Sequence, residues 1–489
     1  MSNSVRSLSY KLSRPGQINA PGISQESKQA VESLLLTDAE KHHCFFNSSG
    51  FHNHLSHHLL VAYDLGASPA HLKKIYEEES KSQRAIILEE RDANIVVTDD
   101  NWIQYLGNQS AYAAFVKFFS ERIERNGSTA VLEQYVFDEN ANTDEKRMLV
   151  CLMSGLFHPF IQVGHGVEFG DDTLIATGLA QTAVHNPTAP EAYKFEYSLH
   201  NASNDPKQSL TVLEIIRAVY DSEALHPPMP YEPNALYGAR LKPLTTGERL
   251  TEILKITSQF HIADPTSQTE LDSKIQEFVW ASVLLLFATG RSGHKPRLDF
   301  FMMHFVTSSI WLHPLIGTLK SPVAKVNLLR AFLSTILLAM LARGRPRINA
   351  QLLMSYTATP RPPTTQPLFT LTRTAMGSPL DDAEYNPWPA IISDSLYHPE
   401  AHATKTLRTL IFASQQYGTT AAGQVVGAYG KSGVQPTHDG IEKVDGTIFV
   451  RAAGVLMDYM GWVTHGQEAR PDWDRSAHGW DAAWDTEVD

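Results

Sequence analysis

Histidines gathered in one short stretch are the residues of this chain best suited to chemistry. Residues 51–60 read Phe-His-Asn-His-Leu-Ser-His-His-Leu-Leu, inside a pattern that predicts an amphipathic helix. Because residues four apart share a helix face, we expect His54 and His58 to point their imidazoles into one small volume. Two such rings can bind a metal ion or move protons near neutral pH. The alternative is a half-exposed helix without chemistry, since the glutamate of the zinc-protease motif is missing.

Four further positions carry groups that could act in a site, and each also has an ordinary structural explanation. His158 precedes a proline, which disfavours helical geometry at His158 and can aim its side chain at a specific place. His304 is the imidazole of an almost wholly apolar helix that begins near Asp299, and burying it without a partner would cost roughly 1–3 kcal/mol. Lys405 stands at the start of a predicted helix. A packed core histidine or an exposed lysine would explain each position without function.

Helical patterns dominate the elements that must position these side chains, so we expect a mainly α protein with one large, single-lobed helical domain. Gly66, Ser68 and Pro69 predict that the histidine helix ends and a second helix starts at once, which makes a helical hairpin. Only 85–88 and 95–97 resemble short strands. Further helices are expected at 99–125 with a break near Gly107, and at 144–157, 209–218, 245–262, 273–288, 298–316, 324–342, 403–417 and 447–460.

Two segments near the C-terminus differ from this pattern. The proline-rich stretch 357–389 cannot be continuous helix and is expected to form a long surface loop or lid. The acidic, tryptophan-rich tail 471–484 is too aromatic for a solvated tail, so we expect it to pack back onto the body.

Composition narrows the classes of partner. The formal net charge is −12, with 41 Lys plus Arg against 53 Asp plus Glu, which argues against a nucleic-acid binder or an anionic-membrane binder. Cys44 and Cys151 are too few for a disulfide framework. No apolar leader segment follows the first residues, and the longest apolar run, 331–342, is short enough for a buried helix. A cytoplasmic protein without membrane spans is the expectation.

Several motifs in one order carry a resemblance to the fungal questin oxidase family. The resemblance extends from about residue 45 to the C-terminus, which leaves 1–44 as an N-terminal extension and 45–489 as the catalytic domain. The chain differs from the family at His165, where a tyrosine is more usual. The motifs are Asn53-His54-x-x-His57-His58, His158-Pro159-Phe160-Ile161 with Glu168, Gly178-Leu179-Ala180, Asp299-Phe300-Phe301-x-x-His304, Lys405-x-x-Arg408 and Gly479-Trp480-Asp481-x-x-Trp484.

The resemblance implies oxidative opening of the central ring of a hydroxyanthraquinone in polyketide biosynthesis. Members of this family act as Baeyer–Villiger oxidases or as ring-cleaving dioxygenases. At least one relative holds a non-haem iron with four histidines and a carboxylated lysine. The matching positions in this chain are His54, His58, His158, His304 and Lys405.

The chemistry of the substrate class assigns roles to these residues. A quinone is electron-poor, so the substrate is expected to arrive as its hydroquinone, with NADPH consumed by an upstream reductase partner. A histidine then removes a phenolic proton, O2 adds as a peroxide, and insertion beside a carbonyl gives a lactone that hydrolyses to a benzophenone carboxylic acid. Besides His158, the expected groups are His54, His58 and His304 as bases, Asp299 to orient an imidazole, and Lys405 to stabilise the oxyanion.

Three alternatives remain open at this point. In a metal-dependent version, Fe(II) is held by the same side chains and a ring C–C bond is cleaved by a dioxygenase. In a version of another class, the protein is a non-catalytic helical binder of small aromatic molecules, and its histidines are structural. A hydrolase is less favoured, because no Gly-x-Ser-x-Gly nucleophile elbow is present.

Overall fold

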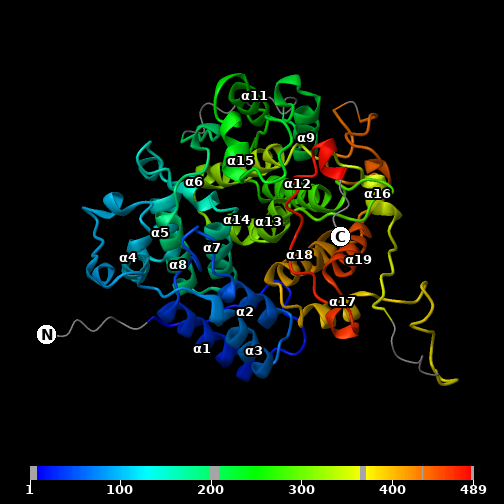
Figure 1. Ribbon diagram of the computed structural model, residues 1–489, viewed down its shortest axis with the longest axis horizontal. Coiled ribbons are helices and arrows are strands. Elements are labelled where there is room, and N and C mark those ends of the chain that lie inside the picture. The colour runs from blue at the N-terminus through cyan, green and yellow to red at the C-terminus, as the bar shows by residue number, and fades with distance from the viewer. Residues whose placement is uncertain (1–7, 198–208, 364–370, 432, 486–489) are drawn as a thin grey trace. The chain divides into compact units, whose positions relative to one another are not determined.

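The computed structural model describes residues 8–197, 209–363, 371–431 and 433–485 (Figure 1). These residues form α-helices, short 3₁₀-helices and turns, with no β-strand among them, which confirms the expected mainly α fold. The prediction of short strands at 85–88 and 95–97 was wrong. Ala85 makes one isolated bridge to His42, because no neighbouring strand is there to extend the pairing.

The chain divides into two compact units, and α12 (Gln268–Phe287) and α15 (Pro322–Ala342) contribute residues to both. Unit 1 comprises Met1–Ser209, Leu244–Ile275 and Trp311–Leu337. Its own helices are α1 (Gln25–Lys41), α2 (Leu55–Asp64), α3 (Pro69–Glu79), α4 (Tyr112–Asn126), α5 (Ser128–Leu132), α6 (Met148–Met153), α7 (His158–Phe169), α8 (Asp172–Val184), α11 (Gly247–Thr257) and α14 (Leu312–Thr318).

The predicted helical hairpin is confirmed in unit 1. α2 ends at Asp64, Gly66 turns the chain with a φ of +90°, and Ser68 caps α3 by accepting the backbone N–H of His71. Pro69 occupies the first turn of α3, where its missing N–H costs no hydrogen bond. In Figure 1, α1, α2 and α3 form the blue group, in which each helix contacts the other two. Every residue of α2 is buried, so the histidine stretch lies in the core.

Helices α7 and α8 pack against each other, and both escaped sequence-based prediction. A Cβ at Gly166 would lie 2.7 Å from the backbone nitrogen of Ile175, and one at Gly178 would lie 2.7 Å from that of Val163. Glycine at these positions therefore lets the two backbones approach closely. From Leu174 onwards every residue of α8 is buried, so the helix has no polar face and no amphipathic period to detect.

Unit 2 comprises Leu210–Pro243, Gln276–Ile310 and Leu338–Asp489. Within it α18 packs against α13 and α19, and α17 contacts both α18 and α19. The helices α17, α18 and α19 form the orange and red group of Figure 1. The helices of unit 2 are α9 (Val212–Asp221), α10 (Tyr237–Leu241), α13 (Phe300–Ser309), α16 (Ala350–Ser355), α17 (Trp388–Ser395), α18 (Ala401–Tyr417) and α19 (Ile448–Met460).

The sequence predicted one helix over 298–316, but the structure has two. α13 ends at Ser309 and α14 begins at Leu312, and Pro314 in the first turn of α14 cannot donate a backbone hydrogen bond to Ile310 at the break. Trp311, between the two helices, donates its indole N–H to Glu168 at 2.9 Å in unit 1. Pro314 is therefore a local signal for the break, and the tertiary hydrogen bond of Trp311 accompanies it.

The tail packs within unit 2. Trp473, Trp480 and Trp484 are all buried, and each indole N–H has an acceptor. Among the described residues of 357–389, turns and exposed side chains precede α17, while 364–370 lie outside the described residues. The tail thus contributes buried aromatic surface to the core of its unit.

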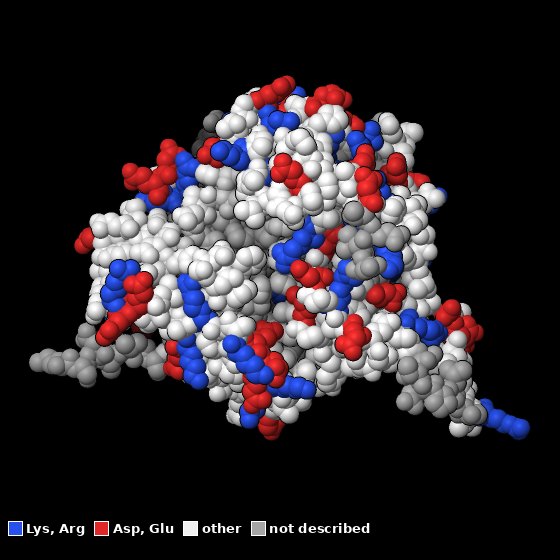
Figure 2. All heavy atoms as spheres, in the orientation of Figure 1, with Lys and Arg blue, Asp and Glu red and all other residues white. Residues whose placement is uncertain are grey.

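Among the residues that the structure describes, one helix is long and apolar enough to cross a membrane by length and composition alone. It is α15, most of whose apolar window is buried inside the protein, and the core helix of a globular protein passes the same test. Figure 2 shows acidic and basic side chains interspersed over the face that it draws.

Candidate functional site

In unit 1 the structure brings His54 and His158 together. His54 immediately precedes α2, His158 is the first residue of α7, and their Nε2 atoms are 2.8 Å apart. The Nδ1 atom of His158 lies 2.5 Å from the carbonyl oxygen of Gly155, so Nδ1 carries the hydrogen and Nε2 offers a lone pair. His54 can donate a hydrogen bond to that lone pair. The same spacing also suits two adjacent ligands of one cation, which lie about 3 Å apart when each N–metal bond is about 2.1 Å.

A left-handed backbone segment precedes His158. Gly155, Leu156 and Phe157 have φ values of +58°, +56° and +66°. For the two residues with side chains this conformation costs of order 1–3 kcal/mol each and is typical of functional sites. The expectation that His158 itself leaves helical geometry was wrong, because it begins α7 and the unusual conformation falls on the residues before it.

A second pair of histidine rings, His52 and His185, lies next to His158. His52 stacks on His158 with ring centroids 4.0 Å apart, and its Nε2 lies 3.0 Å from Nε2 of His185. His185 donates its Nδ1–H to the carbonyl of Gln181, so His52 must donate to His185. Burial lowers the pKa of His185 to about 4, which keeps this ring neutral at neutral pH.

His58 has a different partner from His54. Its Nδ1 contacts Glu79 of α3, whereas His54 contacts His158 of α7. His57, between them, bonds Gln162 at 2.9 Å. Because α2 is buried on all sides, its histidines find partners around its whole circumference instead of on one shared face.

In unit 2 the structure brings His304 of α13 next to His402 of α18, with ring centroids 5.1 Å apart. His304 donates its Nδ1–H to the carbonyl of Phe300 at 2.8 Å, and His402 donates its Nδ1–H to Glu400 at 2.5 Å. Each ring therefore keeps a lone pair on Nε2 when it is neutral. Burial lowers the pKa of both imidazoles, that of His304 to well below its usual range, so both are neutral at neutral pH.

Lys405 lies one turn after His402 on α18 and is buried. Its charge further lowers the pKa values of His304 and His402. Burial raises the pKa of Glu400, but His402 and Lys405 outweigh burial and hold it well below its usual range. Glu400 is therefore a carboxylate at neutral pH, next to a cation and two neutral imidazoles.

Asp299 was expected to orient an imidazole, and its hydrogen bonds in the structure go to the backbone and to an arginine. One of its oxygens caps α13 by accepting the N–H groups of Phe301 and Met302, and the other accepts Arg343 at 2.7 Å. The carbonyl of Phe300 orients His304 instead. The reason is positional, since a residue at the N-cap of a helix directs its side chain to the free N–H groups of the first turn.

The carboxylate and the second imidazole of unit 2 were not among the residues predicted from the sequence. Glu400 and His402 stand immediately before Lys405, so an imidazole three residues before a lysine on one helix face was an available signal. In unit 1, His52 and His185 were not predicted either, and nothing in their sequence spacing predicts that they meet.

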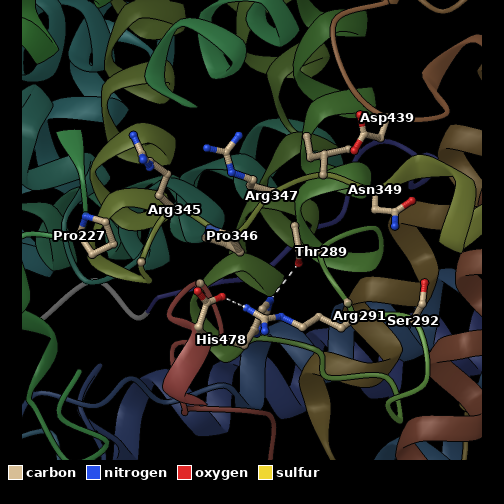
Figure 3. A pocket seen from close by; sticks show the side chains of 15 residues that line it. Pro227, Thr289, Arg291, Ser292, Arg345, Pro346, Arg347, Asn349, Asp439 and His478 are labelled. Carbon is tan, nitrogen blue, oxygen red and sulfur yellow. Dashed lines mark hydrogen bonds and ion pairs between the residues drawn. The ribbon is translucent and has the colours of Figure 1, made fainter. Parts of the chain in front are cut away.

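A polar cavity in unit 2 has a different character (Figure 3). Its volume is about 460 Å³, and Arg291, Arg345, Arg347, Asp439 and His478 are among the residues that line it. Much of this charge is structural, since Arg345 donates to backbone carbonyls and Arg291 pairs with Asp481. None of the six predicted site residues lines this cavity. Its charged wall does not suit a flat aromatic ligand, which needs mainly apolar contacts.

An acidic cluster in unit 2 consists of Asp299, Asp474 and His478, whose potential ligand atoms lie within 4.8 Å of one another. Arg343 pairs with Asp299, and Arg297 lies 3.9 Å from Asp474. Two guanidinium groups thus already balance the two carboxylates. The cluster holds the tail against the start of α13 and needs no metal ion for charge balance.

A family model described as questin oxidase-like matches residues 51–410 of this chain. The chain belongs to the questin oxidase-like family. All six predicted site residues, and also Glu400 and His402, lie inside the matched region of this questin oxidase-like chain, whereas the tryptophan-rich tail lies outside it.

Curated relatives of this questin oxidase-like chain come from fungi. A questin oxidase of Aspergillus terreus is 27% identical over 334 residues, which cover 68% of this chain and 73% of that protein. A questin oxidase of Aspergillus fumigatus is 29% identical over 58% of this chain and 63% of its own length. The Baeyer–Villiger oxidase mdpL of Emericella nidulans is 29% identical over 64% of this chain and 68% of its own length. These names identify the relatives as oxidoreductases.

Proposed function

We propose that this protein opens the central ring of a hydroxyanthraquinone by Baeyer–Villiger oxidation, with O2 as co-substrate. The observation that carries the proposal is the pair of neutral, buried imidazoles, His304 and His402, beside Lys405 in a chain whose relatives are named questin oxidase and Baeyer–Villiger oxidase. The substrate is a small aromatic polyketide in its hydroquinone form. The product is a lactone, which hydrolyses to a benzophenone carboxylic acid.

The reaction balances without a further reductant. Hydroquinone and O2 combine to a hydroperoxide. The ring carbon then migrates to the inner oxygen as the O–O bond breaks, which inserts this oxygen between the carbonyl carbon and the ring, and the outer oxygen leaves as water. The two electrons of the hydroquinone reduce the oxygen atom that leaves. Hydrolysis adds one water across the lactone. NADPH is therefore needed only upstream, where a reductase partner converts the quinone to the hydroquinone.

The residues of unit 2 supply the proton transfers and the charge. A neutral Nε2 of His304 or His402 accepts the phenolic proton. An imidazole of lowered pKa is a weak base, so the transfer needs the positive charge of Lys405 to stabilise the phenolate and then the peroxide anion. In unit 1, the Nε2 atoms of His54 and His158 can pass a proton between the two rings.

An iron(II)-dependent dioxygenase is the second candidate, and the lowered pKa values favour it, because an imidazole that stays neutral binds a metal ion without losing a proton. His304 and His402 offer two imidazoles, and a carboxylated Lys405 would complete a set of two histidines and one carboxylate. Lys405 must lose its charge for this, since an ammonium group repels a cation. Bound iron(II) would activate O2 directly.

Oxygen uptake with a chemically reduced emodin-type hydroquinone tests both candidates. The protein is measured after metal chelation and again with Fe(II) added, and the mass of the first product is recorded. Uptake that survives chelation, with a lactone one oxygen heavier than the quinone, supports the cofactor-free oxidase. Uptake that requires Fe(II) supports the dioxygenase.

Variants separate these candidates from a non-catalytic binder. H304Q and K405M should abolish uptake while the protein stays folded. Tight hydroquinone binding without uptake in either condition would establish the ligand-binding alternative and overturn the proposed oxidation.

A further inference from the structure

Glu400 has an unusually complete set of donors for a carboxylate that contacts a histidine. Its Oε1 accepts the Nδ1–H of His402 at 2.5 Å. Its Oε2 accepts the backbone N–H of Ala403 and the indole N–H of Trp473, each at 2.9 Å. Three donors from two segments thus fix both oxygens, so the carboxylate plane cannot rotate without breaking a hydrogen bond.

The choice of residue at this helix start also needs an explanation. Glu400 is the N-cap of α18, a position where serine, threonine, aspartate and asparagine are preferred. The longer glutamate side chain can cap the helix with one oxygen and still reach the ring of His402 with the other. Helix capping alone does not require that reach, whereas orienting an imidazole does.

The donor from the tail is itself held firmly. Trp473 is 4% exposed, and the next residue, Asp474, pairs its backbone with Leu298 and Phe300 at the start of α13. The guanidinium of Arg475 lies 3.8 Å from the ring centre of Phe300. Trp473 therefore joins the helix that carries His304 to the helix that carries His402.

We propose that Glu400 and Trp473 are positioning residues that set the tautomer and the ring plane of His402, and so hold its ring against that of His304. This gives the tryptophan-rich tail a role in the reaction, through a hydrogen bond to Glu400. The inference rests on the proposed function for its kinetic consequence only. The orientation of His402 can be observed without catalysis.

Three variants of the full-length protein test the proposal. E400Q removes the charge from the pair, and W473F removes only the N–H donor while it keeps an aromatic ring. W484F is the matched control, because Trp484 is an equally buried tryptophan of the same tail whose N–H bonds the carbonyl of His478 instead. Circular dichroism confirms that each variant is folded.

The first readout is NMR of protein with ¹⁵N-labelled histidine. The wild type should show a strongly downfield N–H proton from the short bond between His402 and Glu400. This resonance should disappear in E400Q, move in W473F and stay in W484F. An unchanged resonance in folded E400Q, or equal shifts in W473F and W484F, would overturn the proposal whether or not the protein oxidises hydroquinones.

The second readout is steady-state oxygen uptake. Loss of a group that orients a functional histidine typically costs about 10- to 100-fold in activity. We expect E400Q to lose kcat in this range with little change in KM, W473F to lose less, and W484F to match the wild type. Wild-type kcat in folded E400Q would contradict a positioning role, whereas absence of uptake in the wild type would contradict only the proposed function.

Discussion

Replacing Asp299 tests whether this acid is structural or catalytic. Both partners of the Asp299–Arg343 pair are buried, with side chains 0% and 2% exposed and a 2.7 Å contact. Removing one partner of such a pair leaves an uncompensated buried charge and costs about 3–5 kcal/mol. Asp299 also caps α13, and losing a cap costs about 1 kcal/mol.

The choice of replacement residue separates the cost of the broken ion pair from the cost of the lost helix cap. Asparagine keeps a capping oxygen but no charge, so D299N should lower the free energy of unfolding by about 3–5 kcal/mol. D299A should lose about 1 kcal/mol more, because the cap is lost as well. The assay is urea unfolding at pH 7 followed by circular dichroism, with R343M and the double variant to complete the cycle. The double variant should lose less than the sum of the single variants, since neither charge is then left alone.

Activity decides between the two interpretations of Asp299. The folded fraction of D299N should keep its kcat, because the carbonyl of Phe300 orients His304. A D299N protein with wild-type stability and no oxygen uptake would refute this reasoning and restore the catalytic role expected from the sequence. Serine at the same position, which caps a helix well, is the matched control for the helix start.

Further predictions concern packing, pH dependence and the imidazoles. G164A should destabilise unit 1 by about 1–3 kcal/mol, because the new Cβ would lie 2.4 Å from Cγ of Trp311, whereas G238A, whose Cβ meets nothing within 4 Å, should be neutral or slightly stabilising in the same urea titration. Since folding lowers the pKa of His185 from 6.5 to about 4, its neutral ring stabilises the fold above pH 6.5, and this stability is lost as the pH falls towards 4. H185Q should therefore lose less stability than the wild type over that range, by about 3 kcal/mol, and equal losses in the two proteins would contradict the assigned pKa. H304Q should bind hydroquinone with nearly wild-type affinity and consume no O2, and a retained rate would exclude His304 from proton transfer or metal binding.

Much of the fold could be predicted from the sequence, namely the helices and turns that local sequence signals specify. The Gly66–Ser68–Pro69 turn was predictable because each residue has a conformational preference that applies in any context. Helices with one polar face, such as α4 and α19, were found from their periodicity. The buried α7 and α8 were missed because burial on all sides removes that periodicity. The break before α14 was missed although Pro314 marks it, because the apolar pattern continues across the break.

The sequence by itself also determined the family and the residue types available for chemistry, because ordered motifs and composition are properties of the chain. Only the tertiary structure decided which of those residues meet. It placed His54 beside His158, turned His58 to Glu79, made Asp299 a helix cap with an arginine partner, and brought Glu400, His402 and Trp473 into one group. The physical reason is that a hydrogen bond between side chains depends on distance and direction to within a few tenths of an ångström, and residues such as His54 and His158, 104 positions apart, acquire that geometry only through the packing of whole helices.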